Sequence, residues 1–236
     1  MTITLSIAEL TQQFPDFRVA VLVAEDLSIK TERSGALDAE IASHEAECRT
    51  RWGGTELSDI PGIAAWRAAY RAFGVKKTSY RCSVERLIKN VLAERELPRI
   101  NGFVDAYNGI SLAHELCVGA DDLDKTEGPF AFRFSRVGDT FIDMAAEAGD
   151  DPNDPPKEGE VVYADARHVL CRRWNWRQDA RSIITPATKR AIVTLQSNGA
   201  GDPLAAAEAL ATLLVRDCGA KVRIGVADGA RAEVTL

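Results

Sequence analysis

The sequence predicts an α+β (mixed α/β) fold for residues 1–236, as a single domain of two to three layers with a mixed sheet. Three observations support this prediction. Helical and strand-like patterns alternate irregularly along the chain, hairpin-like strand pairs gather in its second half, and no glycine-rich phosphate loop follows a strand. A chain of 236 residues is also long enough to bury a sizeable core.

The first half of the chain predicts one buried strand and then several helices. The apolar run at residues 17–24, which follows Pro15, is typical of a buried strand. Helices are expected at residues 34–50 and 60–74, and in the second of these Trp66 and Tyr70 belong to an apolar stripe. Ser83 is a favourable N-cap for a third helix that reaches residue 96.

The second half predicts strands, one acidic loop and a final helix. We expect a loop at residues 119–128. It does not bind calcium, because the sixth position counted from Asp122 is Glu127 rather than glycine and the twelfth is Arg133 rather than glutamate. Strands are expected at residues 130–137, 160–164, 168–173, 189–195 and 222–226, and an exposed acidic loop at residues 148–159. Asp202 and Pro203 predict the start of a helix that Gly219 closes.

Several classes of protein are disfavoured by the composition. No apolar run is long enough to span a bilayer and the first residues lack a signal-peptide pattern, so we expect a cytoplasmic protein without a membrane partner. The five cysteines are widely spread and are expected to be reduced. The three histidines lack metal-ligand spacing, and we expect neither a metal nor a cofactor.

The charge distribution is uneven although the net charge is only −6. Residues 66–99 and residues 167–190 each carry a net charge of +6, so the remainder of the chain is strongly acidic. Such segregation can steer a polyanion to one face of an acidic protein. The alternative is that these basic residues are only solvated helix faces.

Closely spaced polar residues mark the segment at residues 98–112. If it becomes helical after Gly102, Asp105 and Asn108 share one face and Asn101 stands at the entry. Buried polar groups must be hydrogen-bonded, so these side chains either cap the chain locally or receive a ligand. His114 follows on the same segment; it is either structural or a weak base that orients a water molecule.

The segment at residues 171–179 combines aromatic and cationic side chains. Trp174 and Trp176 flank Asn175, and Arg173 and Arg177 lie on either side of them. Nucleic acid bases stack on such rings and arginines hold phosphates, which fits the terminal adenosine of a tRNA. In the alternative interpretation, the tryptophans pack inward and the arginines extend into solvent.

Four motifs, taken together and in order, resemble a known family. They are Tyr70-Arg71-Ala72-Phe73-Gly74, Tyr80-Arg81-Cys82-Ser83-Val84-Glu85, the stretch from Pro98-Arg99-Ile100-Asn101 to Tyr107-Asn108, and Arg173-Trp174-Asn175-Trp176-Arg177. The chain resembles the free-standing B3/B4-domain proteins, which are similar to the editing domain in the beta subunit of phenylalanyl-tRNA synthetase. The resemblance covers residues 60–197, and residues 1–59 and 198–236 are expected to be packed extensions.

The resemblance implies a mixed α/β fold with a pocket that hydrolyses a misattached amino acid from tRNA. Two departures bear on this expectation. The position that matches the pocket histidine of the synthetase is Gly119, and the glycine-rich strip of the synthetase is replaced by residues 174–177. Neither the substrate nor the activity can therefore be carried over.

From the patterns and the resemblance together we expect a trans-editing hydrolase that acts on tRNA and its amino-acid moiety. The alternatives are a non-catalytic module that binds an amino acid or a tRNA end, and a small-molecule hydrolase unrelated to tRNA. The expected catalytic residues are Asn108, Asp105, His114 and Glu160. The expected substrate-binding residues are Asn101, Tyr80, Ser83, Glu85, Trp174, Asn175 and Trp176, and the expected tRNA-binding residues are Arg81, Arg99, Arg173 and Arg177.

Overall fold

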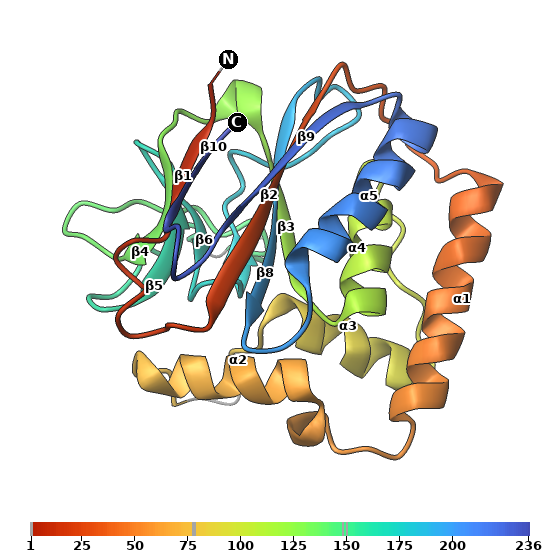
Figure 1. Cartoon of the computed structure of the whole chain (residues 1–236), viewed down its shortest axis with the longest axis horizontal. Coiled ribbons are helices and arrows are strands. Elements are labelled where there is room, and N and C mark those ends of the chain that lie inside the picture. Colours follow the sequence, from red (N-terminus) through yellow and green to blue (C-terminus); the bar gives the residue numbers. More distant parts are fainter. Residues whose placement is uncertain (1, 77–78, 148, 150) are drawn as a thin grey trace.

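Two β-sheets and a group of helices make up the computed structural model, which describes residues 2–76, 79–147, 149 and 151–236 (Figure 1). The helices are α1 (Gly35–Trp52), α2 (Pro61–Ala72), α3 (Ser83–Leu92), α4 (Gly102–His114) and α5 (Pro203–Cys218), with short 3-10 helices η1 (Leu57–Asp59) and η2 (Leu123–Lys125). This arrangement of helices with one antiparallel and one mixed sheet confirms the predicted α+β class.

The first sheet has the strand order β3-β8-β2-β9 and is antiparallel throughout. Its strands are β2 (Phe17–Glu25), β3 (Cys117–Asp122), β8 (Ala191–Asn198) and β9 (Lys221–Ala227). All residues of β2 from Val19 to Ala24 are buried, because β2 is a central strand that is covered on both faces. This burial explains why its sequence is continuously apolar rather than alternating.

The second sheet is mixed and has the strand order β10-β1-β4-β5-β6-β7. Its strands are β1 (Thr4–Ser6), β4 (Phe130–Phe134), β5 (Val161–Ala164), β6 (Val169–Arg172), β7 (Arg177–Gln178) and β10 (Glu233–Thr235). β1 pairs with β4 in parallel, whereas the other pairs are antiparallel. The predicted pairing of the strands near residues 160–164 and 168–173 is therefore confirmed.

The sheets and helices lie in successive layers (Figure 1). α4 and α5 cover one face of the first sheet, and α1 packs on α4 from outside. Aromatic rings join the two sheets: Phe17 of β2 contacts both Phe132 of β4 and Trp174, with centroid distances of 5.2 and 4.8 Å. Edge-to-face contacts of this kind add to the free energy gained by burying the rings.

Three expectations about secondary structure are wrong. Residues 119–128 are not wholly a loop, because β3 continues to Asp122 and pairs with β8 along its whole length. The N-cap of α3 is Cys82 rather than Ser83, and this helix ends at Leu92, before residue 96. The short strands β1 and β10 are missing from the prediction, since three residues are too few for a visible alternation.

The two ends of α5 and the cysteines agree with the sequence prediction. Asp202 accepts hydrogen bonds from the backbone N–H groups of Leu204 and Ala205, and Gly219 ends α5 at a φ of 66°. All five cysteines are free thiols. Among the described residues, no helix is both long and apolar enough to cross a bilayer.

Candidate functional site

A cavity of about 260 Å³, which we call the chamber, lies where the two sheets meet α3 and α4. Each of these elements contributes side chains or backbone to it. From α3 and α4 come Ser83, Arg86, Tyr107 and Asn108; from β3 and β8 come Val118, Gly119, Ala120, Asp121, Thr194 and Gln196; from the second sheet and its loops come Met144, Ala145, Tyr163, Leu170, Cys171, Asn175, Trp176, Arg177 and Gln178.

A strained turn between β6 and β7 presents two of these side chains. Arg173 and Trp174 both have positive φ values, of 46° and 66°, which L residues rarely adopt. The turn is held because the Trp174 ring is fully buried against Phe14, Phe17 and Trp66. As a result, the next two residues, Asn175 and Trp176, line the chamber.

Asn175 is fixed by hydrogen bonds on both sides of its amide. Its Oδ1 accepts a hydrogen bond from the Tyr70 hydroxyl at 2.9 Å, and its Nδ2 donates to Gln196 Oε1 at 3.2 Å. Its backbone carbonyl accepts from the Ser83 N–H at 3.0 Å, which ties the turn to the start of α3. The orientation of this amide is thus set by the fold.

Asp121 is the buried acidic side chain of the chamber, with 4% of its surface exposed. Its Oδ1 accepts hydrogen bonds from Ser182 Oγ at 2.6 Å and Gln178 Nε2 at 3.0 Å. Burial raises the pKa of the Asp121 carboxyl to about 7; the Asp179 and Asp165 carboxylates also raise it, whereas the two hydrogen bonds lower it. At neutral pH this group can therefore both accept and release a proton.

Two hydroxyl groups of the chamber are buried without a hydrogen-bond partner among the described residues. They belong to Tyr163 and Ser83. Since Cys82 occupies the cap position of α3, the Ser83 hydroxyl is not used to cap the helix. Asn108 likewise forms no side-chain hydrogen bond within the described part of the chain. Asn108 is only partly buried. The two buried hydroxyls favour a polar ligand, because each buried unpaired group costs about 1–3 kcal/mol.

A surface hollow that adjoins the chamber, which we call its opening, is basic and aromatic. It is formed by Ser79, Tyr80, Arg81, Arg86, Trp176 and Arg177, three of which also line the chamber itself. The Arg173 guanidinium packs on the rings of Tyr80 and Trp176, 3.9 and 4.4 Å from their centroids. Arg177 forms an ion pair with Asp143, whereas Arg86 is exposed and has no ion pair among the described residues.

The structure brings together only part of the set of predicted site residues. Five of them line the chamber: Asn108, Ser83, Asn175, Trp176 and Arg177. Tyr80 and Arg81 lie at its opening, and Arg173 lies behind the Tyr80 and Trp176 rings. The two polar clusters that the sequence separates by more than sixty residues thus converge through Asn108 and Asn175.

The polar residues at the start of α4 lie outside the chamber. Asn101 caps the helix, since its Oδ1 accepts from the N–H groups of Phe103 and Val104. Asp105 accepts from the Ile100 N–H at 2.9 Å, and burial raises the pKa of its carboxyl. His114, in the last turn of α4, does not line the chamber, and burial lowers the pKa of its imidazole.

Four further predicted residues also lie elsewhere. Glu160 accepts two hydrogen bonds from the fully buried Arg172, at 2.7 and 3.1 Å. Trp174 is in the core, and Arg99 pairs with Asp38 of α1 at 2.9 Å. Glu85 faces a different cavity, where it accepts hydrogen bonds from both Arg67 and Arg81.

The main residue that sequence reasoning missed is Asp121. The sequence places it in the loop expected at residues 119–128, in which three more acidic residues follow it by position 127. The preceding apolar run at residues 116–120 is the signal that could have placed it at the end of a buried strand. Tyr163, Gln178 and Arg86 were also missed, and no local pattern distinguishes them.

Metal ligands are not grouped in the described part of the chain: no three His, Cys, Asp or Glu side chains are arranged to hold an ion. The polar groups of the chamber are one carboxyl, two guanidinium groups, and several carboxamides and hydroxyls. This donor and acceptor set suits an organic ligand that carries both donors and acceptors.

A model of the B3/4 domain family matches residues 65–199, which is more than half of the chain. Among solved structures, the chain is similar to an N-terminal fragment of the phenylalanyl-tRNA synthetase beta subunit from Pyrococcus horikoshii, with 11% sequence identity and a TM-score of 0.45. The match covers 94% of this chain and 50% of the other, so this chain spans about half the length of that fragment. No curated protein matches the sequence. The family match confirms the resemblance seen in the motifs, and the chain belongs to the B3/4 domain family.

Proposed function

We propose that the chain hydrolyses the ester that joins an amino acid to the 3′ end of tRNA. The observation that carries the proposal is the chamber, in which a buried carboxyl with a pKa of about 7 shares one cavity with the unpaired hydroxyls of Ser83 and Tyr163. Its basic, aromatic opening supplies the second requirement, a surface for a single-stranded RNA end.

The size of the chamber fits an amino acid. A protein cavity that binds one benzene molecule measures about 150 Å³. The 260 Å³ of the chamber therefore leaves room for the ammonium and ester groups beside a side chain of that size. Apolar walls from Val118 and Leu170 would contact the substrate side chain, while the polar groups would fix its orientation.

In the proposed reaction Asp121 acts as the general base. A water molecule held by Asp121 attacks the ester carbonyl carbon and gives its proton to the carboxylate. Amide donors from Asn108 and Asn175 stabilise the negative charge that develops on the carbonyl oxygen. The ester C–O bond then breaks, the ribose oxygen takes the proton back, and free amino acid and tRNA are released.

The opening has a different role in this proposal. The Trp176 ring offers a stacking face for the terminal adenine, and Arg86 and Arg177 contact the adjacent phosphates. Neutralising phosphates makes the affinity depend on salt, because counterions are released on binding. Raising the ionic strength should therefore increase KM for a charged tRNA by a larger factor than it decreases kcat.

A second candidate function, binding without hydrolysis, is favoured by Gly119. This residue lines the chamber, and a Cβ atom built on it would have no neighbour within 4 Å. The chamber thus has no side chain at the position where the resemblance places the histidine of the synthetase. A module of this kind would capture an aminoacylated end and release it unchanged.

One experiment separates the two functions. The full chain is incubated with a panel of tRNAs that each carry a cognate or noncognate amino acid, and release of the amino acid is measured beside binding by calorimetry. Hydrolysis of at least one member, lost in Asp121→Asn, supports the hydrolase. Tight binding of a charged tRNA without turnover supports the binding module, and neither binding nor turnover with any member refutes both.

A further inference from the structure

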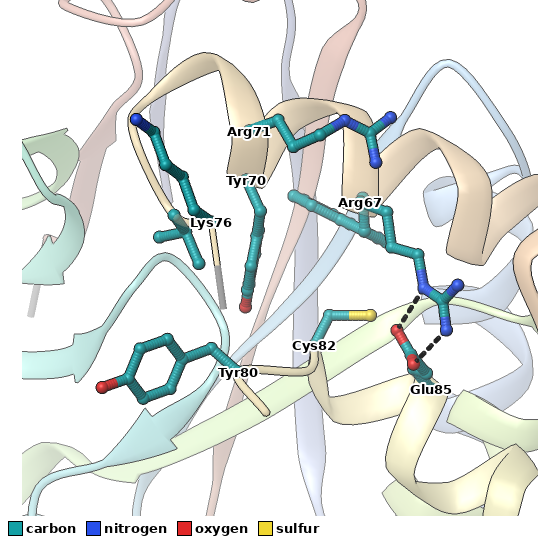
Figure 2. Close-up of a pocket in the computed structure, with 9 residues that line it drawn as sticks. Arg67, Tyr70, Arg71, Lys76, Tyr80, Cys82 and Glu85 are labelled. Atoms are coloured by element: carbon teal, nitrogen blue, oxygen red, sulfur yellow. Dashed lines mark hydrogen bonds and ion pairs between the residues drawn. The ribbon is translucent and has the colours of Figure 1, made fainter. Parts of the chain in front are cut away.

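A second cavity, of about 150 Å³, lies between α2 and the start of α3; we call it the α2–α3 cavity (Figure 2). Its buried carboxylate is already paired, because Arg67 donates to both oxygens of Glu85, at 2.7 and 3.2 Å. Tyr70 differs from this pair: its ring lines the α2–α3 cavity, whereas its hydroxyl donates at 2.9 Å to Asn175 Oδ1, in a residue of the chamber. Tyr70 therefore links the two cavities.

Three side chains of the chamber continue this link. They form a series of hydrogen bonds that we call the polar row, which consists of Asn175, Gln196 and Thr194. Asn175 Nδ2 donates to Gln196 Oε1 at 3.2 Å, and Gln196 Nε2 donates to Thr194 Oγ1 at 3.0 Å. Gln196 and Thr194 are alternate residues of β8, so their side chains lie on the same face of the sheet. All the hydrogen bonds thus run in one direction, away from Tyr70.

The polar row does not fix its own direction. A carboxamide can lie either way round, with its oxygen and nitrogen exchanged, and a hydroxyl can donate or accept. If both amides were reversed, each hydrogen bond of the row would run the other way, and the Tyr70 hydroxyl would accept a hydrogen bond instead of donating one. The direction must therefore be set from outside the row.

Tyr70 can set this direction because its proton has a single acceptor. Only 4% of Tyr70 is exposed, and among the described residues its hydroxyl forms a hydrogen bond only with Asn175. Burial raises the pKa of this hydroxyl far above its usual value, so the group keeps its proton. In the reversed row that proton would have no acceptor among the described residues, which is unfavourable for a buried donor.

The observed direction leaves three hydrogens without an acceptor among the described residues. They are one N–H of Asn175, one N–H of Gln196 and the O–H of Thr194, all in buried side chains that line the chamber. In the reversed row the Thr194 proton would be used within the row, and the oxygen of Asn175 rather than its nitrogen would lie beside Gln196. The direction therefore decides how many donors the chamber offers to a ligand.

We propose that Tyr70 is a positioning residue whose hydroxyl keeps the polar row in its donating direction. The substrate group that matches a row of donors is an oxygen that gains negative charge, such as the carbonyl oxygen of an ester under attack. This match rests on the proposed function, in which Asn175 donates to that oxygen; the direction of the row does not. Tyr70 acts through Asn175, because it lines the α2–α3 cavity and not the chamber.

The first test is Tyr70→Phe, which removes the hydroxyl and keeps the ring. We expect kcat on the best tRNA substrate to fall at least ~10-fold while KM changes less than about twofold, because the donors act on charge that develops during the reaction. The matched control is Ser111→Ala. It removes another buried hydroxyl with one hydrogen bond, to the Leu116 carbonyl, outside both cavities, and should keep kcat within about twofold of the wild type.

A second variant tests whether Tyr70 acts through the polar row. Thr194→Val keeps the shape of the side chain and removes the hydroxyl at the far end of the row. If Tyr70 directs that hydroxyl, the loss of kcat in Tyr70→Phe/Thr194→Val should be at least ~3-fold smaller than the product of the two single losses. Losses that multiply would mean that Tyr70 acts independently of the row, and would overturn the proposal.

Nuclear magnetic resonance gives a readout that does not require activity. In the isotope-labelled full chain, the NH₂ group of Asn175, assigned through Asn175→Asp, should show strong Overhauser contacts to Gln196 and weak contacts to the ring at position 70. In Tyr70→Phe the amide should populate both orientations, so the contacts to that ring should strengthen. An unchanged amide orientation in Tyr70→Phe overturns the inference, whatever the rates.

The outcomes separate this inference from the proposed function. If the wild type hydrolyses no charged tRNA, the hydrolase is refuted, and the orientation of the Asn175 amide still decides the inference. If the wild type hydrolyses its substrate but Tyr70→Phe and Ser111→Ala lose equal activity, the inference alone is refuted.

Discussion

The start of α4 and the chamber both bury polar side chains, but only the chamber leaves them unpaired. At the start of α4, Asn101 accepts two backbone hydrogen bonds and Asp105 accepts one. In the chamber, the hydroxyls of Tyr163 and Ser83 have no partner among the described residues. The comparison teaches that buried polar residues can either be used within the fold or be left available to a ligand; unused hydrogen-bonding capacity is what distinguishes the chamber as the candidate site.

The sharpest test of this comparison changes one buried carboxyl in each region to its amide. Asp121→Asn should reduce deacylation at least ~100-fold, because a general base contributes about 10²- to 10⁴-fold. Asp105→Asn keeps the oxygen that accepts from Ile100 and should leave the rate within about twofold. Initial rates on the best tRNA substrate, measured across pH, provide the readout.

The pH profile adds a second criterion to the same pair of variants. The wild-type rate should rise with pH as Asp121 loses its proton, with a midpoint near its pKa of about 7. The profile of Asp105→Asn should overlay that of the wild type. Equal losses of rate in the two variants would mean that the chamber has no special role in the reaction.

The Asp121 carboxyl should also make the unfolding free energy of the protein decrease as the pH rises. Burial raises the pKa of Asp121 from 3.8 to about 7 in the folded protein, so the folded state binds this proton more tightly than the unfolded state. Its favourable contribution is full below about pH 4 and is lost as pH rises through about 7. The unfolding free energy of Asp121→Asn minus that of the wild type should therefore increase by about 2–4 kcal/mol between pH 4 and pH 7. Urea denaturation at the two pH values measures this difference.

Filling the chamber without touching its polar groups tests the role of its volume. Gly119→Val places two methyl groups in space that is open beside the Gly119 Cα, on a strand where valine is favourable. We expect binding or hydrolysis of the preferred aminoacyl-tRNA to fall about tenfold, while the urea midpoint does not decrease. A fall in stability with unchanged ligand affinity would show that the ligand lies elsewhere.

The smallest effect is expected at the start of α4. Asn101→Ala removes the side-chain oxygen that caps the helix, so the unfolding free energy should fall by about 1–2 kcal/mol. KM and kcat should not change in urea-free buffer, because this side chain does not line the chamber. An increase in KM would indicate that the two polar regions are coupled through α4.

Much of the fold could be predicted because local patterns and tertiary contacts agree. β2 is central and buried, so it has a continuous apolar run that predicts a strand. The Asp202 cap and the Gly219 end of α5 are local signals that predict the bounds of that helix. β3 escaped prediction because tertiary pairing with β8 extends it through Asp121 and Asp122, two residues that disfavour strands. In this case pairing outweighed local propensity.

The candidate site could be predicted only in part, for a related reason. Asn108, Asn175 and Trp176 stood out because polar and aromatic residues were concentrated near them in the sequence. Asp121 and Tyr163 come from separate strands, and only the packing of two sheets places both on one chamber. No spacing rule along the chain contains that information, since the residues meet through topology alone.

The left-handed turn at Arg173 and Trp174 has a consequence for ligand affinity. Its unfavourable backbone geometry is compensated during folding, when the Trp174 ring enters the core and Asn175 acquires its partners on both sides. These contacts hold the part of the chamber formed by Asn175 in place without any ligand. Association should require little loss of conformational entropy in this turn, which leaves more of the interaction energy available for discrimination between similar ligands.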